Sequence, residues 1–125
     1  MKHQISSPDA PAAIGPYSQA IRTGNLLFVS GQLPVNPATG AVVEGDAKAQ
    51  AAQSCANLAA ILAEAGASLA SVVKTTVFIT DMAHFPLVNE AYAAAFAAPF
   101  PARSCVAVRA LPLGCLVEIE AVAAL

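Results

Sequence analysis

Basic residues are scarce in this sequence. Six of the 125 residues are Lys or Arg, against eight Asp or Glu, and the formal net charge is −2. A protein that binds nucleic acid through its phosphates needs a concentrated positive field, so we expect no nucleic-acid partner. Linkers, repeats and charge runs are also absent. Residues 1–125 are therefore expected to form a single domain, long enough to bury a core without disulfides or a metal.

Cysteine is also sparse. The three cysteines are Cys55, Cys105 and Cys115, an odd number whose spacing fits no metal motif. This favours free thiols in a reducing compartment. The polar, proline-containing start lacks the apolar segment of a secretory signal, and no apolar run reaches membrane-spanning length. We expect a soluble cytoplasmic protein with no membrane partner.

Hydrophobic residues, by contrast, make up 57% of the chain, while charged residues make up 11%. Many of the hydrophobic residues are alanine, which contributes little to a core. Even so, a small domain so poor in charge is expected to leave apolar surface exposed, and association with identical copies is the usual way to cover it. The composition favours a homo-oligomer.

Strand patterns dominate the first third of the chain and return later. A short edge strand is expected at residues 3–6, followed by a hairpin of residues 18–22 and 26–30 that turns at Thr23-Gly24-Asn25. Residues 72–80 are dense in β-branched side chains and predict a central strand.

Two helices are predicted. Apolar residues spaced by three and four predict the first over residues 46–65, with Asp46 as its N-cap and Gly66 ending it. The second begins near Pro86 and runs to about Ala97, with a buried apolar stripe formed by Phe85, Val88, Tyr92 and Phe96. The order of strands, helix, strand, helix and two strands predicts an α+β fold, with both helices on one face of a mixed sheet.

The C-terminal segment has the pattern of a hairpin. Residues 101–109 (PARSCVAVR) lead through 111–114 (LPLG) into 116–122 (LVEIEAV). With residue 107 opposite 118, alternation would place Arg103, Cys105, Glu118 and Glu120 on one face, with Arg103 and Glu118 about 13 Å apart along the strands. A small anion would fit between them. A slip of one residue would move the acids to the other face.

Arg103 and Glu118 are the main candidates for chemistry, because a charge within an apolar strand is costly unless it is exposed, paired or used on a ligand. The planar fork of Arg103 suits a carboxylate, although an ion pair or an exposed edge position would also explain it. Glu118 in a partly apolar pocket would have a raised pKa and could exchange protons with water. An exposed strand acid is the alternative.

Other polar residues carry weaker signals. Cys105 has no evident base beside it, so a packing residue whose backbone contacts a ligand is preferred over a nucleophile. Tyr17 is either a buried aromatic with a bonded hydroxyl or a ligand contact. Asn89 is either solvated on its helix or in reach of a neighbour. Ser30-Gly31 ends a buried strand, as at a pocket or at an ordinary turn. The two histidines, His3 and His84, are interpreted as surface residues rather than metal ligands.

Six segments in order resemble the Rid (YjgF) family, and its RidA branch in particular. They are residues 13–20 (AIGPYSQA), 27–32 (LFVSGQ), 73–78 (VKTTVF), 88–92 (VNEAY), 101–105 (PARSC) and 117–121 (VEIEA). The resemblance is collinear from about residue 3 to 125. Two departures lie at the C-terminal turn: Leu113 stands where many members carry Lys, and Cys115 where Ala is common.

The resemblance implies a chorismate-mutase-like fold assembled as a homotrimer, with three sites in the clefts between subunits. It implies hydrolysis of 2-imino and enamine acids (2-aminoacrylate, 2-iminopropanoate, 2-iminobutanoate) to 2-keto acids and ammonia, with no cofactor or metal. By the same resemblance, Arg103 would hold the substrate carboxylate and Glu118 would position or activate the attacking water. The Cys105 backbone would contact the imine or the water. The residues expected to line the cleft, partly from the neighbouring subunit, are Tyr17, Ser30, Gly31 and Asn89.

An alternative is a member that binds keto acids or a partner protein without catalysis. Such a binder would need Arg103 but not Glu118, so the presence of both favours an enzyme. Branches of the family linked to RNA cleavage or to holding other proteins are also known, and the low basic charge makes RNA the weaker option.

Overall fold

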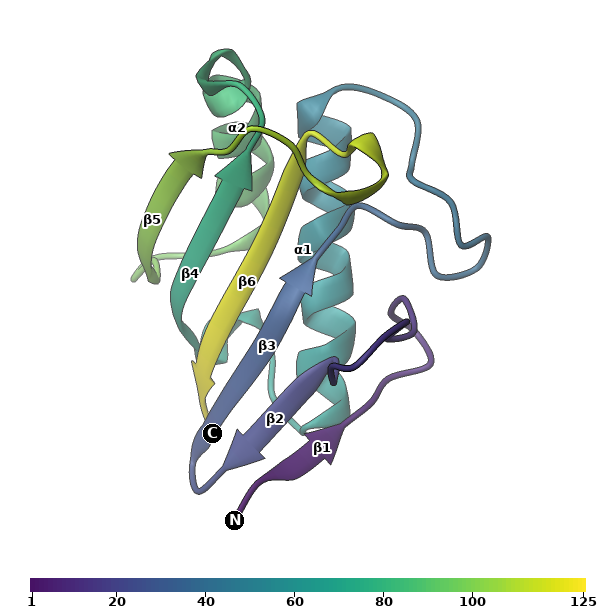
Figure 1. Ribbon diagram of the computed structural model, residues 1–125. Helices are drawn as coiled ribbons and strands as arrows, with labels where there is room; N and C mark the ends of the chain where they lie inside the picture. Colours follow the sequence, from purple (N-terminus) through teal and green to yellow (C-terminus); the bar gives the residue numbers. More distant parts are fainter.

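The computed structural model describes residues 1–125. Six strands form one sheet in the order β1-β2-β3-β6-β4-β5, and both helices cover the same face of it (Figure 1). The strands are β1 (His3–Ile5), β2 (Ala20–Thr23), β3 (Leu26–Gln32), β4 (Val72–Ile79), β5 (Ala102–Ala107) and β6 (Val117–Ala124). The pair β4 and β5 is parallel and the other pairs are antiparallel. The predicted α+β fold, a mixed sheet with two helices on one face, is confirmed.

The first helix, α1 (Ala47–Glu64), has the ends that local sequence predicts. The Asp46 Oδ1 accepts a hydrogen bond from the Ala49 N–H at 3.0 Å. Gly66 follows the helix with a φ of +75°, the left-handed conformation that glycine adopts at low cost. The fully buried side chains of α1 include Leu58 and Leu62, which join the core between the helices and the sheet.

The second helix, α2 (Phe85–Ala95), connects β4 to β5. It carries Pro in its first turn, as predicted. Its predicted apolar stripe is buried at Val88, Tyr92 and Phe96, and Phe85 is partly buried against the same core. Because α2 returns the chain over one face, β5 pairs with β4 in parallel.

The predicted C-terminal hairpin is wrong. Strands β5 and β6 are not neighbours, because β4 lies between them and pairs with both. Residue 107 is aligned with Ile79 rather than with residue 118. The segment after β5 passes the end of β4, where the Val108 N–H donates to the Ile79 carbonyl, before the chain enters β6 on the other side.

This topology places the predicted pair of charges on opposite faces. Arg103 lies opposite Thr75, which is fully buried under the helices, so Arg103 and Cys105 belong to the helix-covered face. Glu118 lies opposite Phe78 and projects, with Glu120, from the open face. The expectation that all four share a face is therefore wrong. Arg103 and Glu118 are offset by three residues along the strands and by two strands across the sheet. Their Cα atoms are therefore about 14 Å apart.

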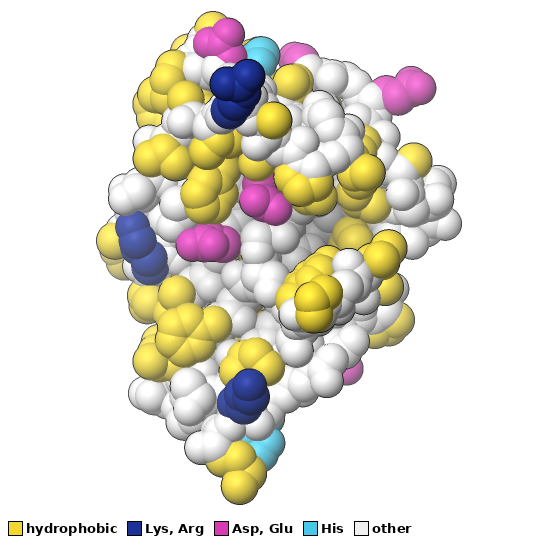
Figure 2. Space-filling model, in the orientation of Figure 1, with side chains coloured by type: hydrophobic (Ala, Val, Ile, Leu, Met, Phe, Trp, Pro, Cys, Tyr) yellow, Lys and Arg dark blue, Asp and Glu magenta, His cyan; other side chains and the backbone are white.

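The open face of the sheet carries apolar side chains. Leu26, Phe28, Val73 and Val106 are each between 37% and 47% exposed. In Figure 2 hydrophobic groups lie around acidic side chains near the centre of this face. The apolar surface expected from composition is present. Neither helix is long and apolar enough to cross a bilayer.

Candidate active site

A cleft of about 900 Å³ opens on the uncovered side of the sheet, beyond the end of β3. Its walls come from residues 11–19, residues 30–40, the turn at Pro112 and Leu113, and the acids of β6. Glu118 and Glu120 are the only charged residues among those that line it. The cleft therefore has no cation of its own.

Gly31 and Glu118 make the closest approach in this cleft. The register between β3 and β6 shifts between Val29 and Gln32, so the backbone bulges at this point. A Cβ atom added to Gly31 would lie 2.8 Å from the Glu118 Cδ and 3.0 Å from its Oε2. Glycine is the residue that lets the carboxyl group lie against β3.

The surroundings of the Glu118 carboxyl group disfavour its charged form. Burial raises its pKa, and the nearby charge of Glu120 raises it further. The one ion pair of the chain joins Lys48 of α1 and Glu90 of α2 at 3.3 Å. No cation therefore offsets the charge of Glu118. A half-buried carboxyl group with a raised pKa holds its proton more readily than an exposed one and is suited to exchanging protons with water.

The wall that carries Tyr17 is fixed by Gln19, a residue that sequence reasoning did not single out. The buried Gln19 side chain accepts a hydrogen bond from the Ser7 N–H at 2.6 Å and donates one to the Pro11 carbonyl at 2.7 Å. These bonds hold residues 7–11 beside β2. Tyr17 itself is 52% exposed, and its hydroxyl accepts a hydrogen bond from the Ile14 N–H at 3.4 Å. Its ring is thus an exposed wall of the cleft rather than a buried aromatic.

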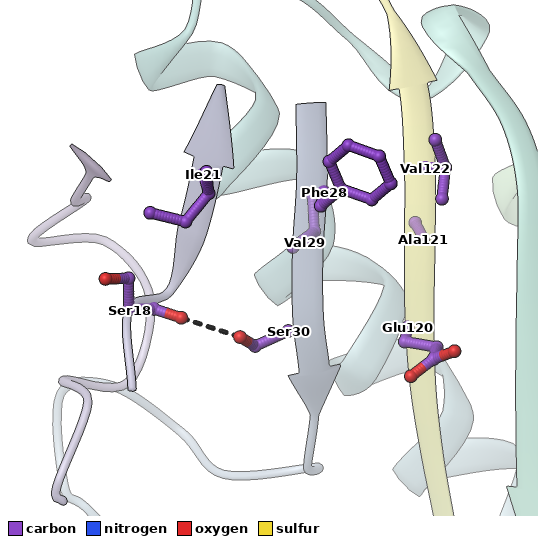
Figure 3. Close-up of a pocket in the computed structure, with 8 residues that line it drawn as sticks. All are labelled: Ser18, Ile21, Phe28, Val29, Ser30, Glu120, Ala121 and Val122. Atoms are coloured by element: carbon purple, nitrogen blue, oxygen red, sulfur yellow. Dashed lines mark hydrogen bonds between the residues drawn. The ribbon is translucent and has the colours of Figure 1, made fainter. Parts of the chain in front are cut away.

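Ser30 lies where the cleft meets a smaller pocket of about 270 Å³ between β2, β3 and β6. Its hydroxyl donates to the Ser18 carbonyl at 2.6 Å, the bond drawn in Figure 3. The Glu120 carboxylate projects from β6 at the other side of this pocket (Figure 3). The Ser30 hydroxyl thus ties β3 to the chain entering β2.

Arg103 belongs to a second group, between β5 and α2. Its Nη1 donates to the Asn89 Oδ1 at 2.8 Å. The guanidinium carbon lies 4.8 Å from the centre of the Tyr92 ring and 5.3 Å from that of Phe85. The Tyr92 hydroxyl in turn shares a 2.7 Å hydrogen bond with the Thr75 hydroxyl. An amide and two aromatic rings therefore orient Arg103, and no carboxylate neutralises it.

Cys105 lies on the same face of β5 as Arg103 and is half-buried. Burial raises the pKa of its thiol, although the charge of Arg103 opposes the shift. The thiol is therefore protonated at neutral pH and is a poor nucleophile. All three cysteines are free. No group of three or more His, Cys, Asp or Glu side chains could hold a metal ion.

The predicted site residues fall into two groups. One group, beside the cleft, comprises Tyr17, Ser30, Gly31 and Glu118. The other group, between α2 and β5, comprises Asn89, Arg103 and Cys105. Within one chain they lie on opposite faces of the sheet. The aromatic support of Arg103 was missed at the sequence level, although the predicted apolar stripe on the second helix contained both rings.

Comparison with known proteins gives the family. The family model described as Endoribonuclease L-PSP matches residues 7–125. This chain belongs to that family, the Rid (YjgF/RidA) family. The resemblance of the six segments is thereby confirmed.

The chain is similar to relatives with different names. It is 50% identical over 126 residues to the 2-iminobutanoate/2-iminopropanoate deaminase of Escherichia coli, covering 98% of each protein. It is 54% identical over 125 residues to a RutC family protein of Sinorhizobium fredii, covering 100% of this chain and 99% of the relative. The crystal structure of RidA from an Antarctic Psychrobacter superposes with a TM-score of 0.95 at 46% identity, covering 98% of this chain and 99% of that one.

Proposed function

We propose that this protein is a deaminase that hydrolyses reactive 2-imino and enamine acids, such as 2-aminoacrylate, 2-iminopropanoate and 2-iminobutanoate, to 2-keto acids and ammonia. The observation that carries the proposal is a pair of charged groups that the chain leaves unpaired: Arg103, oriented by an amide and two rings, and Glu118, whose pKa is raised. Relatives about half identical to this chain, named as deaminases of two such acids, support it.

The site is proposed to form between two copies of the chain. A substrate carboxylate needs a cation, and the only charges lining the cleft are acidic. Arg103 lies on the other face of its own sheet, so the cation comes from a neighbour. A contact between different surfaces of identical copies closes into a ring when the rotation allows. We propose a homotrimer with three such sites, in which the apolar open faces are covered.

The chemistry follows from the two charges. Arg103 of one copy holds the carboxylate by paired hydrogen bonds, which fixes the imine carbon over the cleft of the next copy. Glu118 accepts a proton from water as the oxygen bonds to the imine carbon, and passes a proton to the nitrogen. The resulting carbinolamine passes its hydroxyl proton to nitrogen and loses ammonia as the carbon–oxygen double bond forms. An enamine first tautomerises to the imine by gaining a proton at carbon and losing one from nitrogen.

The remaining residues receive supporting roles in this proposal. Asn89 orients Arg103 through its amide oxygen. Tyr17 and Ser30 shape the cleft wall, and Gly31 admits the Glu118 carboxyl group. The backbone of Cys105 contacts the imine or the water. No cofactor or metal has a part in this scheme, and three free thiols suit action in a reducing compartment such as the cytoplasm.

A coupled assay tests the proposal. A serine dehydratase generates 2-aminoacrylate from serine, and the release of pyruvate is followed with and without this protein. We expect the wild-type protein to speed pyruvate formation and Arg103→Ala to abolish the effect. Arg109→Ala, which removes an exposed arginine outside the site, is the matched control and should retain full activity. Normal rates with Arg103→Ala would refute the assignment, and light scattering that gives a monomer mass would refute the shared site.

A further inference from the structure

Three exposed apolar side chains surround the mouth of the cleft. Ile14 is 90% exposed, Leu113 is 70% exposed and Tyr17 is 52% exposed. Ile14 and Tyr17 come from the loop before β2, and Leu113 comes from the turn before β6, yet all three line the same cleft. We call these three residues the apolar rim. Their convergence from separate segments presents hydrophobic surface to whatever occupies the cleft.

The backbone at Leu113 strengthens the inference. Leu113 has a φ of +60° and a ψ of 18°, and Gly114 after it has a φ of +68°. The Cys115 N–H donates to the Pro112 carbonyl across these two residues. Tight turns with two positive φ angles favour Gly, Asn or Asp, and leucine rarely occupies this conformation. A leucine placed there, 70% exposed in a single copy, is explained neither by turn preference nor by packing within its own chain, and strain of this kind concentrates at functional sites.

We infer that the apolar rim sets substrate preference, with Leu113 as its specificity-determining residue, and that the protein favours 2-imino acids with aliphatic or aromatic side chains of four or more carbons. This inference rests on the proposed function, because it concerns the same cleft. A substrate whose carboxylate is held by the neighbour's arginine and whose imine carbon lies at Glu118 directs its side chain along the cleft toward its mouth.

The size of the cleft supports a larger substrate than the smallest imino acids. In a single copy its volume of about 900 Å³, part of which the neighbouring copy occupies in the proposed assembly, lies at the upper end of pockets that bind small molecules of drug size. A three-carbon acid such as 2-aminoacrylate fills little of it and does not reach the rim. A longer apolar side chain would remove rim surface from water, and each added methylene group in an apolar pocket favours binding by on the order of 10-fold.

The test compares imines of different length. An L-amino acid oxidase, with catalase present, generates the imines of alanine, leucine and phenylalanine, and semicarbazide traps whatever imine is not hydrolysed. The variant is Leu113→Asn, which removes the apolar side chain but suits the positive φ. Leu113→Met keeps an apolar side chain of similar volume. Met82→Asn makes the same chemical change at a residue that is 48% exposed and outside the cleft.

We expect wild type, Leu113→Met and Met82→Asn to prefer the leucine and phenylalanine imines. In Leu113→Asn, kcat/KM for these two should fall about 10-fold, mainly through KM, while that for the alanine imine changes less than about twofold. Equal kcat/KM for all three imines in the wild type, or an equal loss for all three in Leu113→Asn, would overturn the inference.

A binding measurement separates this inference from the proposed function. Calorimetry compares pyruvate with 4-methyl-2-oxopentanoate, the keto acids from alanine and leucine, in wild type and Leu113→Asn. The rim inference is supported if the wild type binds the longer acid more tightly and Leu113→Asn loses this preference. This holds even if no imine is hydrolysed, and in that case only the proposed function fails. Equal binding of both acids by the wild type overturns the rim inference whatever the activity.

Discussion

Gly31 and Glu118 lie so close that a methyl group cannot be added to Gly31 without displacing the Glu118 carboxyl group: a Cβ on Gly31 would stand 2.8 Å from the Glu118 Cδ. The glycine is at the bulge of β3, and the acid is on the neighbouring β6. The two residues therefore define where the carboxyl group lies in the cleft. The place where the Glu118 carboxyl group could exchange protons therefore depends on residue 31 being glycine, which has no side chain.

Replacing Gly31 with Ala should displace the Glu118 carboxyl group. The added methyl overpacks the contact, but the carboxyl group ends a flexible side chain that can turn away, so we expect a loss of only about 1 kcal/mol in the free energy of unfolding, the low end for overpacking. We also expect a loss of activity of about 100-fold, the usual contribution of a positioned acid or base. Urea unfolding and the coupled assay measure the two effects.

A double-mutant cycle identifies the cause. With Glu118 shortened to Ala, the carboxyl group is no longer there to be displaced, so adding Gly31→Ala should then cost little stability. An equal cost in both backgrounds would mean that the strain arises in the backbone of β3 instead.

Glu118→Gln should make the folded chain more stable at pH 7. The raised pKa means that folding favours the neutral carboxyl group, so this group's stabilising contribution is present below about pH 4 and is lost as pH rises through the raised pKa. Glutamine stays neutral throughout and avoids that loss. Thermal unfolding from pH 3.5 to 8 should show a higher Tm for the variant at pH 7 and a difference that shrinks toward pH 3.5. A lower Tm at pH 7 would contradict the account.

Glu120→Gln should shift the pH dependence of activity. The charge of Glu120 contributes to the raised pKa of Glu118, so its removal lowers that pKa. Glu118 must be ionised to accept a proton from water, and kcat/KM therefore rises with pH through its pKa. In the variant this rise should move to lower pH while the plateau keeps at least about half of its height. An unmoved rise would indicate that another group controls it.

Asn89→Asp should weaken substrate binding without unfolding the protein. A carboxylate at residue 89 would pair with Arg103 and compete with the carboxylate of the substrate. We expect KM to increase about 10-fold, in line with the 1.5–3 kcal/mol typical of a hydrogen bond to a charged group. Asn89→Ala serves as the comparison, because it removes the supporting bond without adding a competitor. A smaller rise in KM for Asp than for Ala would argue against Arg103 as the carboxylate anchor.

Thr75→Val tests the support beneath Arg103. It leaves the Tyr92 hydroxyl without its buried partner and should cost about 1–3 kcal/mol of stability. Removing both hydroxyls in the double variant Thr75→Val, Tyr92→Phe should recover most of that loss, because no buried polar group is then unpaired. Chemical denaturation of the single and the double variant checks this, and equal losses of stability in the two would contradict it.

Local features of the fold were predictable from sequence, and distant pairings were not. The Asp46 cap, the Gly66 ending and the first hairpin depend on residues a few positions apart, and each lies as predicted. The C-terminal hairpin failed because a turn-like segment between two strand-like runs says nothing of a third strand between them. Strand β4, rich in β-branched residues, occupies that place and pairs on both sides.

The wrong C-terminal hairpin also explains why Arg103 and Glu118 were predicted on the same face. Alternation predicts that Glu118 shares a face with Arg103 only if their two strands are neighbours. In the structure each keeps the alternation of its own strand, but their common neighbour β4 aligns Arg103 with the buried Thr75 and Glu118 with Phe78. The residue types could be selected from sequence, since charges within apolar strands are unusual. Which face each one occupies depends on sheet order, which local sequence does not encode.

Mixing two inactive variants tests the shared site most directly. Arg103→Ala retains Glu118, and Glu118→Gln retains Arg103, so a mixed oligomer can rebuild intact sites where the two halves meet. Co-expression at equal levels should restore activity to about one quarter of wild type, because each half is intact in half of the copies. Each variant alone should be inactive. A mixed preparation with no more activity than the single variants would contradict a site formed between two copies.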